Sequence, residues 1–114
     1  MTTLISRDDL RKHIDDGTVT VVDALGGIYY EQQHLPGALA LTADEVADRA
    51  AELLPDKDAL IAVYCSNPAC GNSQAVATAL EGLGYTRVRK YREGIQDWVE
   101  AGLPVEAGQP AARG

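Results

Sequence analysis

The stretch Ala59-Leu-Ile-Ala-Val-Tyr64-Cys65-Ser-Asn-Pro-Ala-Cys70-Gly-Asn-Ser73 decides how this chain folds. Its first six residues form a continuous apolar run of strand length, which is typical of a strand covered on both faces. Residues 66–72 form a loop, and an alanine-rich segment with helical spacing follows from Ser73 to Leu83. A buried strand that leads through a loop into a helix predicts a parallel sheet. Cys65 then lies at the carboxyl end of the strand, where open α/β sheets bind their ligands.

The rest of the chain alternates between helical and strand patterns. Ser6 and Asp9 resemble a capping box at the start of a helix that ends at Asp16-Gly17. Further helices are predicted at 29–33, 44–54 and 95–99, and further strands at 18–22, 38–41 and 86–90. This alternation predicts an α/β fold with a mainly parallel central sheet. Trp98, the single tryptophan, is expected in the core.

The length and composition indicate one globular domain. The chain has 114 residues, of which 46% are hydrophobic and 24% charged. We expect the domain to span residues 1–106, and the segment 107–114, rich in Gly, Pro and Ala, to be disordered. No stretch reaches the ~18 apolar residues of a membrane span, and no signal peptide is visible. A cytoplasmic protein without membrane contact is therefore expected.

The charges and the cysteines narrow the possible functions. Ten basic residues against seventeen acidic ones give a net charge of -7, which argues against general nucleic-acid binding. Four of the basic residues lie close together in the sequence and form either a solvated strand face or a positive field beside an anion site: Arg87, Arg89, Lys90 and Arg92. Two cysteines are too few for a structural zinc site, so no metal and no cofactor are expected. Without a secretory signal, a structural disulfide framework is not expected either.

Cys65 is the residue best placed for chemistry. A helix N-terminus presents unpaired N–H groups and a partial positive charge, and a loop that curls into it can aim several N–H groups inward. A cysteine at the base of such a cradle has a stabilised thiolate and a lowered pKa, so it can act as a nucleophile and hold a persulfide. Position alone is equally compatible with a buried strand cysteine that has no chemical role.

Five segments resemble the rhodanese family of sulfurtransferases, in the family's order and spacing. They are Val21-Val-Asp23-Ala24, His34-Leu-Pro-Gly-Ala38, Val63-Tyr-Cys65, the helix that leads to Gly84-Tyr85, and Glu93-Gly-Ile-Gln-Asp-Trp98 with the Gly102-Leu-Pro-Val105 that follows. The resemblance covers residues 4–106. It implies a three-layer α/β/α fold with a mainly parallel central sheet of about five strands.

The resemblance also implies an enzyme, a rhodanese-type sulfurtransferase with Cys65 as the catalytic nucleophile. Cys65 would take sulfane sulfur from a donor such as thiosulfate or a persulfide, carry it as a Cys65 persulfide and pass it to a thiophilic acceptor such as cyanide or a protein thiol. The substrate-binding loop would comprise Ser66, Asn67, Pro68, Ala69, Cys70, Gly71, Asn72 and Ser73. His34 would hold a turn in place, and Asp23 would anchor loop backbone by hydrogen bonds.

The loop departs from the family pattern in length and in charge. Cys65 to Asn72 is eight residues where six are common, and Leu25 stands where the family usually has Arg. The loop holds no Lys or Arg, which disfavours a related phosphatase or arsenate reductase and leaves Arg92 as a possible outside anion contact. Cys70 is either an inert residue on the rim of the loop or a resolving thiol that attacks a persulfide or sulfenate on Cys65. Two alternatives therefore stay open: a thiol redox or sulfur-carrier protein that uses both cysteines, and a non-catalytic binding module.

Overall fold

A five-stranded parallel sheet forms the centre of the protein. The computed structural model describes residues 2–108 and has the strand order β1-β5-β4-β2-β3, with every neighbouring pair parallel. The strands are β1 (Thr3–Leu4), β2 (Thr20–Asp23), β3 (Leu39–Ala40), β4 (Ile61–Tyr64) and β5 (Val88–Tyr91). Asp23, Tyr64 and Tyr91 lie in register, so β2, β4 and β5 end at the same edge of the sheet.

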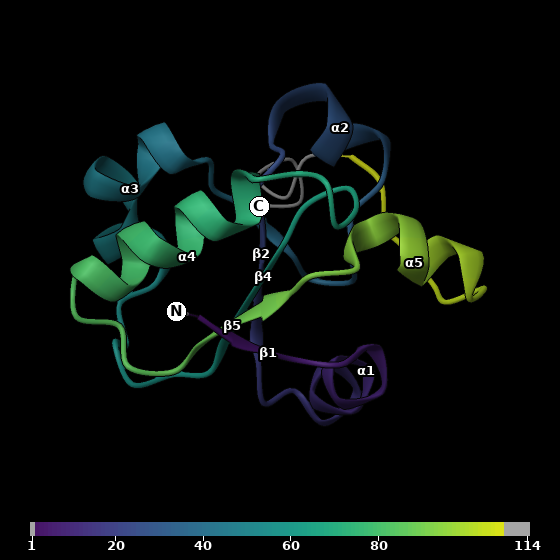
Figure 1. Cartoon of the computed structure of the whole chain (residues 1–114), viewed down its shortest axis with the longest axis horizontal. Helices are drawn as coiled ribbons and strands as arrows, with labels where there is room; N and C mark the ends of the chain where they lie inside the picture. Colours follow the sequence, from purple (N-terminus) through teal and green to yellow (C-terminus); the bar gives the residue numbers. More distant parts are fainter. Residues whose placement is uncertain (1, 109–114) are drawn as a thin grey trace.

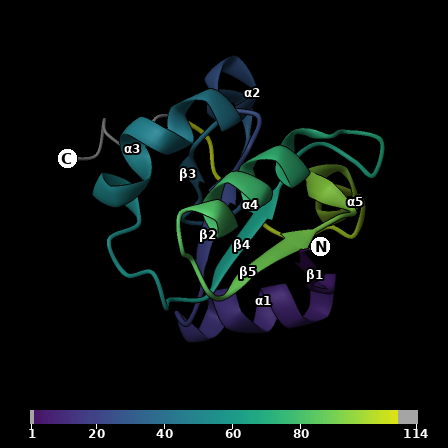
Figure 2. The ribbon, with the colours of Figure 1, turned by 60° about the vertical axis from the view of Figure 1, so that its left-hand side comes forward.

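Helices cover both faces of this sheet and make the three layers of the α/β/α fold. They are α1 (Arg7–Asp16), α2 (Gly27–Gln32), α3 (Val46–Leu53), which follows a 3-10 turn at Ala43–Glu45, α4 (Asn72–Gly82) and α5 (Gly94–Glu100). Figure 1 shows α3 and α4 on one side of the sheet and α1 and α5 on the other, with α2 beyond the carboxyl ends of the strands. In Figure 2, α4 lies across the face of β4 and β5.

The alternation of side chains along β4 sends Cys65 toward α4. Ile61, Val63 and Cys65 belong to the core that packs under α3 and α4. Ala62 and Tyr64 belong to the second core, under α1 and α5. Successive side chains of a strand point to opposite faces of the sheet. Cys65 therefore points to the same face as Ile61 and Val63.

The predicted fold class is confirmed, and the predicted elements all occur with shifted ends. Ser6 caps α1, since its Oγ accepts a hydrogen bond from the Asp9 N–H at 3.1 Å, and Trp98 is 1% exposed. β1 was not predicted from the sequence. This strand has two residues, and both are exposed, so it carries no apolar pattern and is defined only by its pairing with Arg89 and Lys90 of β5.

After α5 the chain pairs with the segment that follows α2. Glu106 forms an antiparallel bridge with His34, and the N–H of Gly108 donates to the carbonyl of Glu31 at 2.8 Å. Residues 109–114, most of the segment expected to be disordered, lie outside the described residues. Within residues 2–108, no helix is long and apolar enough to span a membrane.

Candidate functional site

Cys65 lies in a buried position between the end of β4 and the start of α4. The residue is 1% exposed. Its Sγ is 3.6 Å from the Oγ of Ser73, a buried residue in the first turn of α4, and 3.4 Å from the carbonyl oxygen of Cys70. No side chain among the described residues caps the amino end of α4. The first peptide N–H groups of this helix therefore have no side-chain acceptor in that part of the chain.

The structure joins Cys65 to Cys70 in a disulfide within the loop. Their Cα atoms are 6.4 Å apart, which is within the range of disulfides. The spacing of the two cysteines in the sequence leaves their pairing open, and the structure forms it. The cross-link closes a loop of only a few residues, so it is a local feature of the site and not a framework for the fold. In this state neither cysteine is a free thiol.

A tight turn brings Cys70 back to Cys65. The N–H of Cys70 donates to the carbonyl of Asn67 at 3.0 Å, and the N–H of Ala69 donates to the side-chain Oδ1 of Asn67 at 3.0 Å. Asn at the first position and Pro68 at the second are the residues that such turns prefer. The longer loop thus contains a defined turn at residues 67–70.

The amino end of α5 holds the other side of the loop. The N–H of Ile95 donates to the carbonyl of Cys65 at 2.9 Å, and the N–H of Gln96 donates to the carbonyl of Ser66 at 3.0 Å. The side chain of Gln96 also accepts a hydrogen bond from Asn67 Nδ2 at 3.3 Å. Gly94 permits this approach, since a Cβ there would lie 2.5 Å from the backbone of Ser66. The loop is therefore built by two helix starts, one on each side.

The predicted loop residues differ in how far solvent reaches them. Ser66, Asn67 and Cys70 are partly buried, and Ser73 is buried. The exposed members are Pro68, Ala69, Gly71 and Asn72. The backbone amides of Ile95 and Gln96 complete the site, and the sequence analysis did not identify them because backbone donors carry no side-chain signature. Gly94 was visible in the motif quoted above, but its contact with the loop was not.

Asp23 anchors the neighbouring loop, as predicted. Its Oδ1 accepts hydrogen bonds from the N–H groups of Leu25 at 2.7 Å and Gly26 at 3.2 Å. Its Oδ2 accepts one from the hydroxyl of Tyr64 at 2.6 Å, and that hydroxyl accepts the N–H of Leu35 at 3.1 Å. Burial raises the pKa of Asp23, although these donors oppose the shift. Burial and the nearby Asp23 carboxylate also raise the pKa of Tyr64.

His34 has the structural surroundings that the sequence analysis expected. Its ring stacks on Tyr30 with centroids 3.9 Å apart, and its Nδ1 donates to the carbonyl of Tyr30 at 2.7 Å. Its backbone N–H and carbonyl both pair with Glu106. The residue is completely buried. These contacts tie the turn at 34–38 to the segment after α5.

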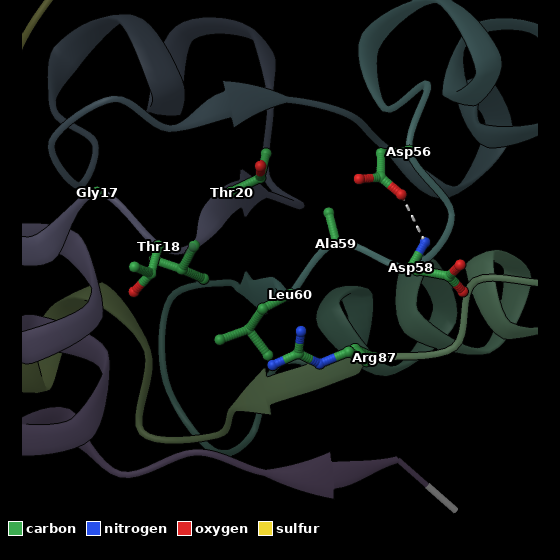
Figure 3. Close-up of a pocket in the computed structure, with 9 residues that line it drawn as sticks. Gly17, Thr18, Thr20, Asp56, Asp58, Ala59, Leu60 and Arg87 are labelled. Atoms are coloured by element: carbon green, nitrogen blue, oxygen red, sulfur yellow. Dashed lines mark hydrogen bonds between the residues drawn. The ribbon is translucent and has the colours of Figure 1, made fainter.

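The four clustered cations do not act together at the loop. Arg87 lines a hollow of about 340 Å³ with Thr20 and Asp56 (Figure 3). These residues precede or start the strands, so the hollow lies at the opposite edge of the sheet from Cys65. Arg92 pairs with its neighbour Glu93 at 3.3 Å, and Lys90 donates to Gln74 in the first turn of α4 at 3.3 Å. Only some of the four clustered cations therefore lie where they can act on an anion at the cysteine loop.

The surface beside the loop is acidic. A hollow of about 190 Å³ borders Asn67 and Pro68 and is otherwise lined by Glu93, Gln96, Asp97 and Glu100. Two of the three acids are already paired, because Arg7 Nη1 lies 3.1 Å from both carboxylate oxygens of Asp97 and Arg92 pairs with Glu93. Over residues 2–108, no three His, Cys, Asp or Glu side chains are arranged so that they could hold a metal ion.

The comparison with known protein families agrees with this geometry. The rhodanese-like domain family matches residues 6–101. The chain belongs to this family. A solution structure of a rhodanese-like domain from Anabaena sp. superposes with a TM-score of 0.79 at 27% identity, covering 94% of this chain and 80% of that one. The resemblance inferred from the five motifs is therefore confirmed.

Two curated relatives of this rhodanese-like domain differ in what their names say. An HTH-type transcriptional regulator of Mycobacterium tuberculosis is 34% identical over 110 residues, which is 96% of this chain and 47% of the regulator. A thiosulfate sulfurtransferase of Escherichia coli is 37% identical over 59 residues, which is 52% of this chain and 55% of that protein. The chain spans about half the length of each of these relatives.

Proposed function

We propose that this rhodanese-like domain transfers sulfane sulfur through a persulfide on Cys65. The observation that carries the proposal is the position of Cys65, at the end of β4 and against the uncapped start of α4. Ser73 Oγ, 3.6 Å away, can donate to a sulfur anion at this place. The similarity to a thiosulfate sulfurtransferase supports the same reaction class.

The reaction proceeds in two displacements. The Cys65 thiolate attacks the outer sulfur of the donor, and the donor's S–S bond breaks as the new bond to Sγ forms. The electron pair leaves with the rest of the donor, which is sulfite when the donor is thiosulfate. An acceptor thiolate or cyanide then attacks the outer sulfur of the persulfide, and Cys65 departs as a thiolate. The N–H groups at the start of α4 stabilise the anion at each stage.

The transfer requires Cys65 in its reduced form. In the disulfide state its sulfur is bonded to Cys70 and the residue is 1% exposed, so a donor cannot reach it. The acidic hollow beside Asn67 and the loop without Lys or Arg favour a donor of low negative charge over a dianion. We therefore propose a persulfide as a better donor than thiosulfate, and a protein thiol as a possible acceptor.

The test is sulfur loading of the reduced protein with thiosulfate and with glutathione persulfide. We expect a mass gain of one sulfur atom or release of sulfite in the wild type, none in Cys65→Ser, and retained sulfite release in Cys70→Ser. Loss of the first transfer in Cys70→Ser alone would contradict the assignment of the nucleophile. No loading of any form by either donor would favour the non-catalytic binding module.

A further inference from the structure

We propose that Cys70 is a resolving thiol that discharges the Cys65 persulfide as sulfide. The domain would then reduce sulfane sulfur at the expense of a dithiol reductant, an activity distinct from sulfur transfer to an acceptor. This inference rests on the proposed Cys65 persulfide. The observation behind it is the disulfide between the two cysteines of one loop.

The loop places Cys70 beside Cys65 by contacts that involve no sulfur. The N–H of Cys70 donates a hydrogen bond to the carbonyl of Asn67 and closes the turn at 67–70. The N–H of Ala69 donates a second hydrogen bond to the side chain of Asn67 and reinforces the turn. Asn67 is held in turn by Gln96 of α5. Because these hydrogen bonds do not depend on the disulfide, the same turn holds the Cys70 thiol near Cys65 after reduction. Its approach to the persulfide is then largely intramolecular and pre-oriented.

The chemistry balances without a further oxidant. The Cys70 thiolate attacks Sγ of the Cys65 persulfide, a bond forms between the two Sγ atoms, and the bond to the outer sulfur breaks. The outer sulfur leaves with the electron pair and takes up the proton from Cys70, so it departs as hydrosulfide. A dithiol reductant then reduces the disulfide by two exchange steps. With thiosulfate as donor, the sum is thiosulfate and a dithiol giving sulfite, sulfide and a disulfide.

The exposure of the two cysteines sets the order of the reductive steps. Cys65 is 1% exposed, whereas Cys70 is only partly buried. An incoming thiolate therefore reaches the sulfur of Cys70 first and forms a mixed disulfide there. Cys65 is the leaving group, and the start of α4 and Ser73 favour its departure as an anion.

A single-turnover experiment tests the resolving step. The full chain is reduced, freed of reductant, and mixed with thiosulfate or glutathione persulfide, after which sulfite, sulfide and the intact mass are measured. We expect the wild type to release sulfide and to end with the mass of the disulfide form. Cys70→Ser should release sulfite from thiosulfate but at least about tenfold less sulfide, and it should keep the added sulfur.

A second variant separates the position of Cys70 from the thiol itself. Asn67→Ala removes the side chain that reinforces the turn and should lower the amount of sulfide released per sulfite. If Cys70→Ser releases sulfide as fast as the wild type, or if the wild type retains the added sulfur, the resolving role is wrong. Retention of the added sulfur on Cys70 would mean attack at the outer sulfur, which also overturns the proposal. Absence of sulfite release and of loading in every form would refute the Cys65 persulfide instead.

Trapping of the reductant checks the order of the exchange steps. The disulfide form of the wild type is mixed with a dithiol protein whose second cysteine has been replaced, so that a mixed disulfide accumulates. Peptide mapping should locate that bond on Cys70. A mixed disulfide found on Cys65 would contradict the order inferred from the exposure of the two residues.

Discussion

Replacing Gly94 by alanine tests the contact between α5 and the cysteine loop. Gly94 has φ +77°, and a Cβ there would lie 2.5 Å from the carbonyl carbon and oxygen of Ser66 and 2.7 Å from the N of Asn67. Gly102 offers a matched control, since it has the same φ of +77° and no atom within 4 Å of the added Cβ. The two substitutions therefore share the backbone strain and differ in the contact with the loop.

The expected costs follow from these two differences. A left-handed conformation costs an alanine about 1–2 kcal/mol, and this is the whole expected effect of Gly102→Ala. Gly94→Ala adds overpacking against backbone that cannot turn aside, at roughly 1–3 kcal/mol. It also weakens the hydrogen bonds from Ile95 and Gln96 to the loop, each of which contributes about 1 kcal/mol. We expect Gly94→Ala to lose roughly 2–4 kcal/mol more than Gly102→Ala.

Thermal unfolding and sulfur loading measure the two consequences. The larger loss should lower the Tm of Gly94→Ala by roughly 10 °C more than that of Gly102→Ala, at about 4 °C per kcal/mol. Displacement of the loop should also slow sulfite release by at least about tenfold in Gly94→Ala, because small shifts of reacting groups are costly. Gly102→Ala should keep the wild-type rate. Equal losses of stability, or a wild-type rate in Gly94→Ala, would refute the argument that α5 shapes the loop.

Three further results are expected. Tyr64→Phe removes the donor to Asp23 and the acceptor of the Leu35 N–H, so it should lower the free energy of unfolding by roughly 1–3 kcal/mol, while Tyr29→Phe at an exposed position should change little. Burial raises the pKa of Asp23, so the folded state binds the carboxyl proton of Asp23 more tightly than the unfolded state does. The free energy of unfolding should therefore fall as the pH rises from the ordinary carboxyl range through the raised pKa. Urea unfolding at a series of pH values should show this fall in the wild type and not in Asp23→Asn. In steady-state kinetics, thiosulfate should show a higher KM than a persulfide donor, and Arg92→Ala should raise it further; a low KM for thiosulfate that Arg92→Ala leaves unchanged would show that backbone amides suffice.

The pattern of the chain predicted most of the fold because that information is local. The apolar run before Tyr64, the capping residue Ser6 and the alternation of elements each report on a few neighbouring residues, and together they allow only a few topologies. The position of Cys65 at a strand end follows from the same run. The role of Asp23 as an anchor could be stated in advance, but its partner Tyr64 could not, because the two are far apart in the sequence.

Tertiary structure decided what surrounds the reactive sulfur. The disulfide depends on a turn that returns Cys70 to Cys65, and sequence spacing alone permits that geometry without requiring it. The backbone donors of α5 reach the loop from a segment about thirty residues away, and a peptide N–H looks the same in every residue of a sequence. The field of the clustered cations was decided in the same way. Arg87 precedes β5 and Arg92 follows it, so the strand between them separates the two residues. Arg87 therefore lies at the end of the sheet opposite Cys65.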